Sequence, residues 1–268
     1  PGLYDLTELQ RDANRRFGFS AKETLNIMQR LYEQHKVLTY PRTDSRYIGS
    51  DIVPTIKERL KACNIGPYKK FIPSLLKAPI KTSKAFVDDA KVSDHHAIIP
   101  TEEFVQLEHM SNDERKIYDL VIRRFISILY PAFEYEQTTL KASAAGQAFT
   151  AKGKIILSPG WKAIYDSSSA ADSSFLDAPE EDDASWQSCE QPLPLLKKGE
   201  QLSISQIALT TGKTKPPARF TEATLLTAME NPVKYMESQD AKARKMLGET
   251  GGLGTVATRA DIIEKLLP

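Results

Sequence analysis

The residues best suited to chemistry lie in one stretch, Tyr40-Pro41-Arg42, which is followed by Thr43-Asp44-Ser45. Pro41 has no amide hydrogen and disfavours a helix at the residue before it, so we expect Tyr40 on extended backbone. A phenol near a fixed guanidinium suits attack on a phosphate, because the cation can neutralise phosphate oxygens and favour a phenolate, whose ordinary pKa is about 10. The alternative is a packed tyrosine followed by ordinary turn and helix-cap residues.

A second string with chemical potential is Ser93-Asp94-His95-His96-Ala97-Ile98-Ile99-Pro100-Thr101. Adjacent histidines on extended backbone point to opposite sides, and no third ligand with suitable spacing accompanies them. The sequence therefore argues against a metal site here and predicts no metal ligands in the chain. A buried or turn-stabilising imidazole remains the alternative to a functional histidine.

Two later strings carry weaker signals. In Gly251-Gly252-Leu253-Gly254-Thr255-Val256-Ala257-Thr258-Arg259, glycines precede a helix capped by threonine, where free amides could meet a phosphate. The string lacks the Gly-Lys-Ser/Thr ending of a Walker loop, and a flexible loop before a helix cap is the alternative. Residues 213–220 are a basic connector stiffened by prolines. The acidic residues 180–183 favour a solvated loop over a cation site.

Composition limits the class of protein. The chain has 268 residues, of which 41% are hydrophobic and 26% charged. No apolar run approaches the roughly 20 residues of a membrane span, and no secretory signal opens the sequence, so we expect a cytoplasmic protein. Cys63 and Cys189 are far apart and favour a reducing compartment. Because the chain starts at Pro1, we expect a piece of a longer protein. Its two ends are mildly basic and its middle is acidic, which fits selective contact with nucleic acid.

The elements that must position Tyr40 are mainly helical. We expect two helices within residues 1–36, the first opened by a Thr7/Gln10 capping box and the second by Ser20 and Glu23. A strand then leads into Tyr40, and this order resembles a winged helix. Further helices are expected after Ser50-Asp51 and from Ser111 to about Pro131.

Beyond Pro131 the periodicity becomes strand-like. We expect a hairpin that turns at Ala145-Gly146, another strand over Leu202 to Ile207, and a flexible loop at 166–192. Thr221 then caps a helix. The expected fold is multidomain α+β: a helical tyrosine-bearing domain at 1–131, a β-rich arch or hinge at 132–212, and the start of a helical domain at 213–268.

The Tyr40 string, the His95 string, the connector at 213–220 and the Gly251 string occur in the order found in type IA DNA topoisomerases. The chain resembles that family across essentially all its length, and Pro41 makes it most similar to the bacterial topoisomerase III branch. Val256 departs from the proline that family members often carry there.

The resemblance implies that Tyr40 attacks a DNA backbone phosphate, forms a 5′-phosphotyrosyl link and later religates the strand without ATP. It implies catalytic roles for Tyr40, Arg42 and His95, and DNA contacts for Arg42, His95, Arg219, Thr255, Thr258 and Arg259. The expected partners are single-stranded DNA and underwound or catenated duplex DNA, with no membrane and with protein partners left open. Mg²⁺ would bind the family's Toprim domain, which this chain lacks, so the fragment alone is expected to be inactive.

Two other classes compete with this interpretation. Tyrosine recombinases also place Tyr, Arg and His at a phosphate, but their tyrosine follows the other motifs, whereas Tyr40 precedes His95. A winged-helix scaffold that binds nucleic acid without cleaving it is the remaining alternative. It predicts salt-sensitive binding that does not depend on the Tyr40 hydroxyl.

Overall fold

The computed structural model describes residues 1–268 except 166–192, 195, 215, 237–240, 250 and 267–268. The chain forms two compact units. Unit 1 combines Pro1–Tyr130 with Phe220–Pro268, and unit 2 is Pro131–Arg219. Two segments that are far apart in sequence thus share one unit. The expected boundary near residue 131 coincides with the first break, whereas a separate domain at 213–268 stays a prediction.

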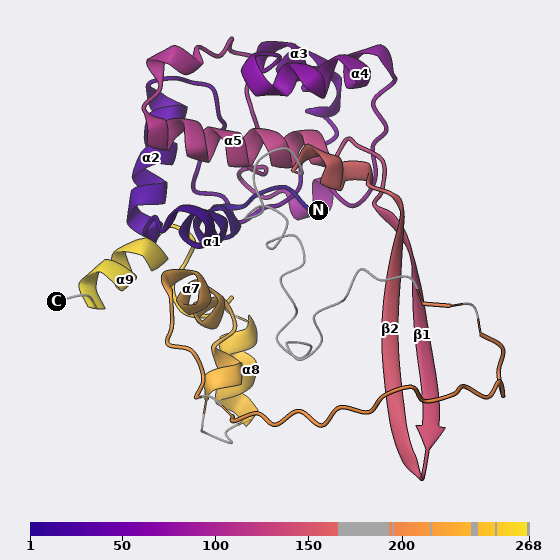
Figure 1. The fold of residues 1–268 in the computed structure, drawn as a ribbon. Helices are drawn as coiled ribbons and strands as arrows, with labels where there is room; N and C mark the ends of the chain where they lie inside the picture. The colour runs from indigo at the N-terminus through magenta and orange to yellow at the C-terminus, as the bar shows by residue number, and fades with distance from the viewer. Residues whose placement is uncertain (166–192, 195, 215, 237–240, 250, 267–268) are drawn as a thin grey trace. The chain divides into compact units, whose positions relative to one another are not determined.

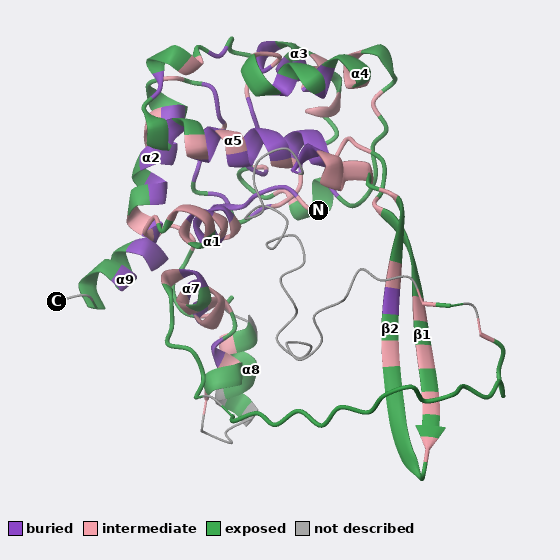
Figure 2. Cartoon of the chain, viewed as in Figure 1, coloured by how far each residue is buried: buried purple, intermediate pink, exposed green. Residues whose placement is uncertain are grey.

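Unit 1 is built from helices joined by extended segments (Figure 1). The first segment carries α1 (Leu6–Phe17), α2 (Ala21–Glu33), α3 (Ile56–Ala62), α4 (Ile72–Lys77) and α5 (Asn112–Ser127). The second carries α7 (Glu222–Glu230), α8 (Ala241–Glu249) and α9 (Arg259–Leu266). The core lies around α5, against which α1 and α2 pack. Figure 2 shows the buried residues gathered along α5, where Tyr118, Val121 and Phe125 are at most 1% exposed.

Helix starts follow local rules in most places. The capping boxes of α2 (Ser20 with Glu23) and α5 (Ser111 with Glu114) are confirmed, and Thr221 caps α7. The expected cap of α1 was wrong. Asp5, whose carboxylate accepts the Glu8 amide hydrogen, caps that helix, and Thr7 is buried within its first turn. The Ser50-Asp51 cap is also wrong, because a 3-10 turn at Val53–Thr55 leads into α3 without any side-chain cap.

Unit 2 contains the expected hairpin. Strand β1 (Glu134–Ala144) pairs antiparallel with β2 (Gln147–Ser158), and Ala145 and Gly146 form the turn with positive φ angles of 50° and 79°. The expected strand at Leu202 to Ile207 does not form: residues 201–214 take no regular secondary structure. The flexible loop predicted at 166–192 falls outside the described residues.

The winged-helix interpretation is not confirmed. Residues 1–130, all of which the structure describes, contain only isolated β-bridges: Tyr4 with Ile98, Leu38 with Pro100, and Ile48 with Val87. Among the described residues the fold is mixed α and β, with the α-helices in unit 1 and the sheet in unit 2.

Candidate functional site

Two extended segments carry the Tyr40 and His95 strings, and backbone hydrogen bonds hold them side by side. The amide of Thr39 donates to the Ile99 carbonyl at 3.0 Å, and the amide of Ala97 donates to the Tyr47 carbonyl at 2.8 Å. Prolines at 41 and 100 limit regular continuation of either segment. The result is a short, irregular pairing that brings together two strings more than fifty residues apart in sequence.

Three side-chain hydroxyls fasten the same two segments. Thr39 donates to the Ala97 carbonyl and accepts from the Ile99 amide. Thr43, which is only 2% exposed, donates to the carbonyl of His95 at 3.1 Å. Ser45 donates to the Lys91 carbonyl at 2.8 Å. The backbone on both sides of the His95 side chain is therefore anchored to the segment that carries Tyr40.

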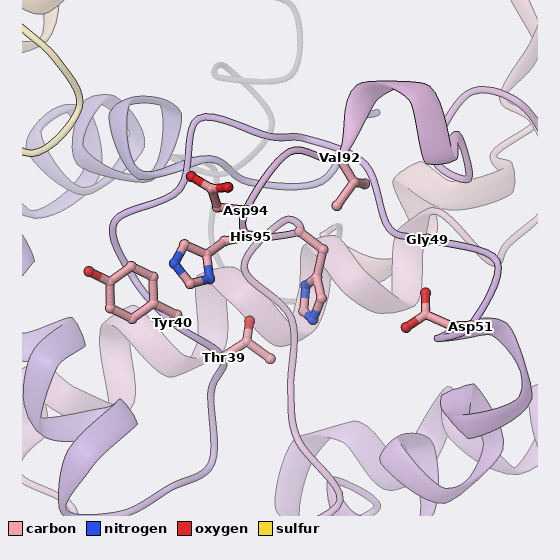
Figure 3. Close-up of a pocket in the computed structure, with 8 residues that line it drawn as sticks. Thr39, Tyr40, Gly49, Asp51, Val92, Asp94 and His95 are labelled. Carbon is pink, nitrogen blue, oxygen red and sulfur yellow. The ribbon is translucent and has the colours of Figure 1, made fainter.

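The Tyr40 and His95 rings lie next to each other (Figure 3). Their centroids are 4.2 Å apart at an angle of 36°. Tyr32 from α2 also contacts the Tyr40 ring, edge-on, with its centroid 5.6 Å away. The rings border a pocket of about 230 Å³, whose lining also includes Thr39, Gly49, Asp51, Val92, Asp94 and His96. Tyr40 is half-buried and His95 is exposed, so solvent reaches this pair.

Arg42 lies outside this pocket lining. Its side chain is exposed, and its positive charge acts on Asp261 near the start of α9. The hydrogen bond and charge of Lys22 lower the pKa of Asp261, and Lys265 and Arg42 add smaller contributions in the same direction.

Several amides of the Gly251 string already have partners within the protein. The Gly252 amide donates to the Leu247 carbonyl, the Leu253 amide to the Met229 carbonyl, and the Thr255 amide to the Thr258 hydroxyl. Thr255 and Thr258 are exposed, so their side chains face solvent at the start of α9.

Arg259 differs from the other predicted DNA-binding residues. It is 5% exposed and donates to Thr7, to Glu230 and to the carbonyls of Gly251 and Leu253. Its prediction as a DNA contact is untested, but its guanidinium is committed to protein groups. Arg219 is exposed in unit 2.

Within the described residues, no group of three or more His, Cys, Asp or Glu side chains is placed to hold a metal ion. The acidic residues 180–183 fall outside those residues. Cys63 is buried as a free thiol, and burial raises its pKa to about 12. In the same part of the chain, no helix is long and apolar enough to cross a membrane.

Sequence reasoning missed the hydroxyl fastening and two acidic pocket residues, Asp51 and Asp94. Thr43 and Ser45 were interpreted as turn residues because each has a common local role. Their hydrogen bonds to the carbonyls of His95 and Lys91 show that they reach across to another segment. The one sequence feature that could have indicated this role was their position shortly after Arg42.

Comparison with known proteins shows the family of this chain. A family model described as DNA topoisomerase matches residues 1–268, and the chain belongs to that family. It is 60% identical over 266 residues to DNA topoisomerase 3 of Bacillus cereus strain ATCC 14579 and 57% identical to DNA topoisomerase 3 of Bacillus subtilis strain 168. Each match covers 99% of this chain but 35% of the relative, so the chain spans about a third of those proteins.

A solved structure shares the fold. The full-length topoisomerase I of Thermotoga maritima matches all of this chain and 38% of its own length, with a TM-score of 0.58 and 20% identity.

Proposed function

We propose that this chain is the nucleophile-bearing part of a type IA DNA topoisomerase and that Tyr40 is the nucleophile. The observation that carries the proposal is the contact between the Tyr40 and His95 rings at the edge of an open pocket. Membership of the DNA topoisomerase family and the names of the Bacillus relatives support it.

In the proposed reaction the Tyr40 oxygen attacks a phosphorus atom of the DNA backbone. A bond forms between that oxygen and phosphorus, and the bond from phosphorus to the 3′ oxygen breaks. The leaving oxygen takes a proton and becomes a 3′-hydroxyl, while the 5′ phosphate stays on Tyr40. One phosphoester replaces another, so the reverse reaction reseals the strand without ATP.

The neighbouring side chains have distinct proposed tasks. His95 donates a hydrogen bond to a phosphate oxygen and holds the phenol ring in place, an effect that strengthens when the imidazole is protonated. Arg42 neutralises the phosphate from outside the pocket with its permanently charged fork. Thr255 and Thr258 contact the bound single strand at the start of α9, and Arg219 contacts the backbone from unit 2.

The whole protein would act on single-stranded DNA and on underwound or catenated duplexes in the cytoplasm. Between cleavage and resealing, the unit 2 hairpin would serve as a hinge while another strand passes. Mg²⁺ would be held by acidic residues in a part of the protein beyond this chain, where it would help to order the phosphates. We therefore propose that these 268 residues do not relax DNA by themselves.

Replacement of Tyr40 by phenylalanine separates this proposal from a binding scaffold. In the full-length protein with Mg²⁺, we expect Tyr40→Phe to abolish relaxation of supercoiled plasmid and to leave the affinity for single-stranded DNA within about twofold, because only the nucleophilic oxygen is lost. Tyr32→Phe, which removes the hydroxyl of the neighbouring ring, is the matched control and should retain relaxation. Relaxation by the Tyr40→Phe protein would refute the assignment.

A further inference from the structure

The hydroxyl of Tyr40 has no hydrogen-bond partner in the part of the chain that the structure describes, so other contacts orient the phenol. Pro41 restricts the backbone of Tyr40 but leaves the torsions of its side chain free. Two aromatic rings contact the phenol ring: the His95 imidazole, with a centroid distance of 4.2 Å, and the ring of Tyr32, at 5.6 Å and an angle of 82°. The orientation of Tyr40 therefore depends on its aromatic neighbours.

Tyr32 stands on a firmly held helix. It lies in the last turn of α2, where Met28 and Leu31 are fully buried in the core. The Val37 amide donates to the Leu31 carbonyl at 3.0 Å, which closes the turn between α2 and the segment that carries Tyr40. The ring of Tyr32 is thus fixed relative to that segment, although 37% of the residue's surface is exposed.

The ring of Tyr32, rather than its hydroxyl, is what it offers to Tyr40. Its hydroxyl also has no hydrogen-bond partner among the described residues, whereas edge-to-face contacts between aromatic rings are favourable. Without such a contact, a tyrosine side chain is distributed among several staggered rotamers. Only molecules with the phenol in the attacking orientation can cleave, so the fraction in that orientation multiplies the cleavage rate.

We infer that Tyr32 is a positioning residue, whose ring holds the Tyr40 phenol in the orientation that attacks phosphate. The inference deepens the proposed function and rests on it for the attack itself. Before cleavage the phenol depends on Tyr32 for its orientation, but after cleavage the new bond to phosphorus holds it. Loss of the Tyr32 ring therefore slows cleavage more than resealing, and it lowers the fraction of DNA that is cleaved at equilibrium.

Replacement of Tyr32 by leucine tests this asymmetry in the full-length protein with Mg²⁺. Leucine favours the helix and keeps an apolar side chain but removes the ring. At saturating single-stranded oligonucleotide we expect the single-turnover cleavage rate to fall about tenfold, because the nucleophile is less often aligned. The affinity for the oligonucleotide, and the resealing rate of preformed covalent complex given a strand with a 3′-hydroxyl, should stay within about twofold of wild type.

Two further variants serve as controls. Tyr32→Phe keeps the ring and should cleave within about twofold of wild type. Glu33→Gln alters the neighbouring exposed residue in the same helical turn and should leave both rates unchanged. Wild-type cleavage by Tyr32→Leu would overturn the inference, as would a loss in Tyr32→Phe as large as that in Tyr32→Leu. Equal slowing of cleavage and resealing would also overturn it, because that pattern indicates general loss of active protein.

The orientation of the Tyr40 ring can also be followed without DNA, by fluorine NMR of full-length protein labelled with fluorotyrosine. Tyr40→Phe identifies the signal of Tyr40 by its loss. We expect this signal to broaden or split in Tyr32→Leu, because the ring samples additional rotamers, and to stay single in Glu33→Gln. A single, sharp Tyr40 signal in Tyr32→Leu would overturn the inference. Absence of a covalent adduct in wild-type protein would instead refute the proposed function, and the NMR result would be unaffected by it.

Discussion

At the scale of single residues, hydrogen bonds from hydroxyl side chains to the backbone hold the site together more than direct contacts between the reactive groups do. Tyr40 and His95 meet through their rings, but the positions of those rings are set by Thr39, Thr43 and Ser45, whose hydroxyls bind backbone atoms of residues 91–99. Because Thr43 holds the carbonyl of His95, the His95 imidazole can move only a short way from the Tyr40 phenol.

Thr43 provides a test of this fastening. Thr43→Val keeps the side-chain shape but removes the hydrogen bond to the His95 carbonyl. We expect the free energy of unfolding to fall by about 1–3 kcal/mol and the rate of DNA cleavage by full-length protein to fall roughly tenfold, since small displacements in a reactive site are costly. Urea unfolding and single-turnover cleavage measure the two effects. Thr43→Ser retains the hydroxyl and should stay within about threefold of wild type. If the Thr43→Val protein cleaves DNA as fast as the Thr43→Ser protein, the hydroxyl of Thr43 does not position His95.

Tyr40 and His95 were chosen from the sequence as candidates for chemistry, but their surroundings could not be predicted from it. Pro41 and the string around it indicated an extended Tyr40, and His95 was the preferred histidine of its pair. Arg259 shows the limit of this reasoning. An arginine at the start of a helix after glycines is typical of phosphate binding, and nothing local signals that it is buried against Thr7 and Glu230, which lie far away in sequence.

At the scale of elements, helix caps were predicted well where all the partners are local. Ser20, Ser111 and Thr221 each form a reciprocal box with a residue three positions later. Asp5 was missed although the Glu8 amide that it caps is local, because Thr7 with Gln10 offered a competing capping pattern. The carboxylate of Asp5 also accepts from Arg46 at 2.6 Å. The observed cap therefore lies two residues before Thr7.

The cap of α5 gives the protein a predictable response to acid. Burial raises the pKa of Glu114, but hydrogen bonds from Arg30 and Ser111 outweigh it and lower that pKa from 4.5 to about 2. The ionised carboxylate therefore stabilises the fold above about pH 4.5, and this contribution is lost as the pH falls towards 2. We expect Glu114→Gln to reduce the free energy of unfolding by about 1 kcal/mol at pH 7 and to flatten its decline below pH 4.5.

Thermal unfolding of Glu114→Gln and wild type from pH 2 to pH 7 measures this difference. Asp113→Asn, in the same helix turn but with an exposed carboxylate, is the control and should follow the wild-type curve. An undiminished decline in Glu114→Gln would show that other groups carry the acid response.

The strand expected at Leu202 to Ile207 does not form, and the reason concerns its possible neighbours in a sheet. Alternating apolar residues indicate that a segment fits a sheet, but a strand exists only where a neighbour supplies hydrogen bonds. Leu202, Ile204 and Ile207 are 53%, 59% and 74% exposed. The hairpin formed because its partner was adjacent in sequence and Ala145-Gly146 could adopt the required turn.

At the scale of the whole molecule, sequence order and spatial organisation differ. The shift in periodicity near Pro131, where the local type of structure changes, lies at the start of the hairpin unit. The return of Phe220–Pro268 to pack with Pro1–Tyr130 could not be predicted in this way. Its contacts join α1 to α7 and α2 to α9, and no local pattern in either segment indicates which distant helix it packs against.

The central claim is that Tyr40 becomes covalently joined to DNA, and one measurement tests it directly. Full-length protein would be incubated with Mg²⁺ and a single-stranded oligonucleotide labelled at its 3′ end, then denatured and digested. We predict that the label stays with protein and that it maps to the peptide containing Tyr40, because the downstream strand keeps its 5′ phosphate on the phenol. An oligonucleotide labelled at its 5′ end should release its label as a shortened strand. Covalent label on any other residue, or no adduct in folded protein that binds the oligonucleotide, would contradict the proposal.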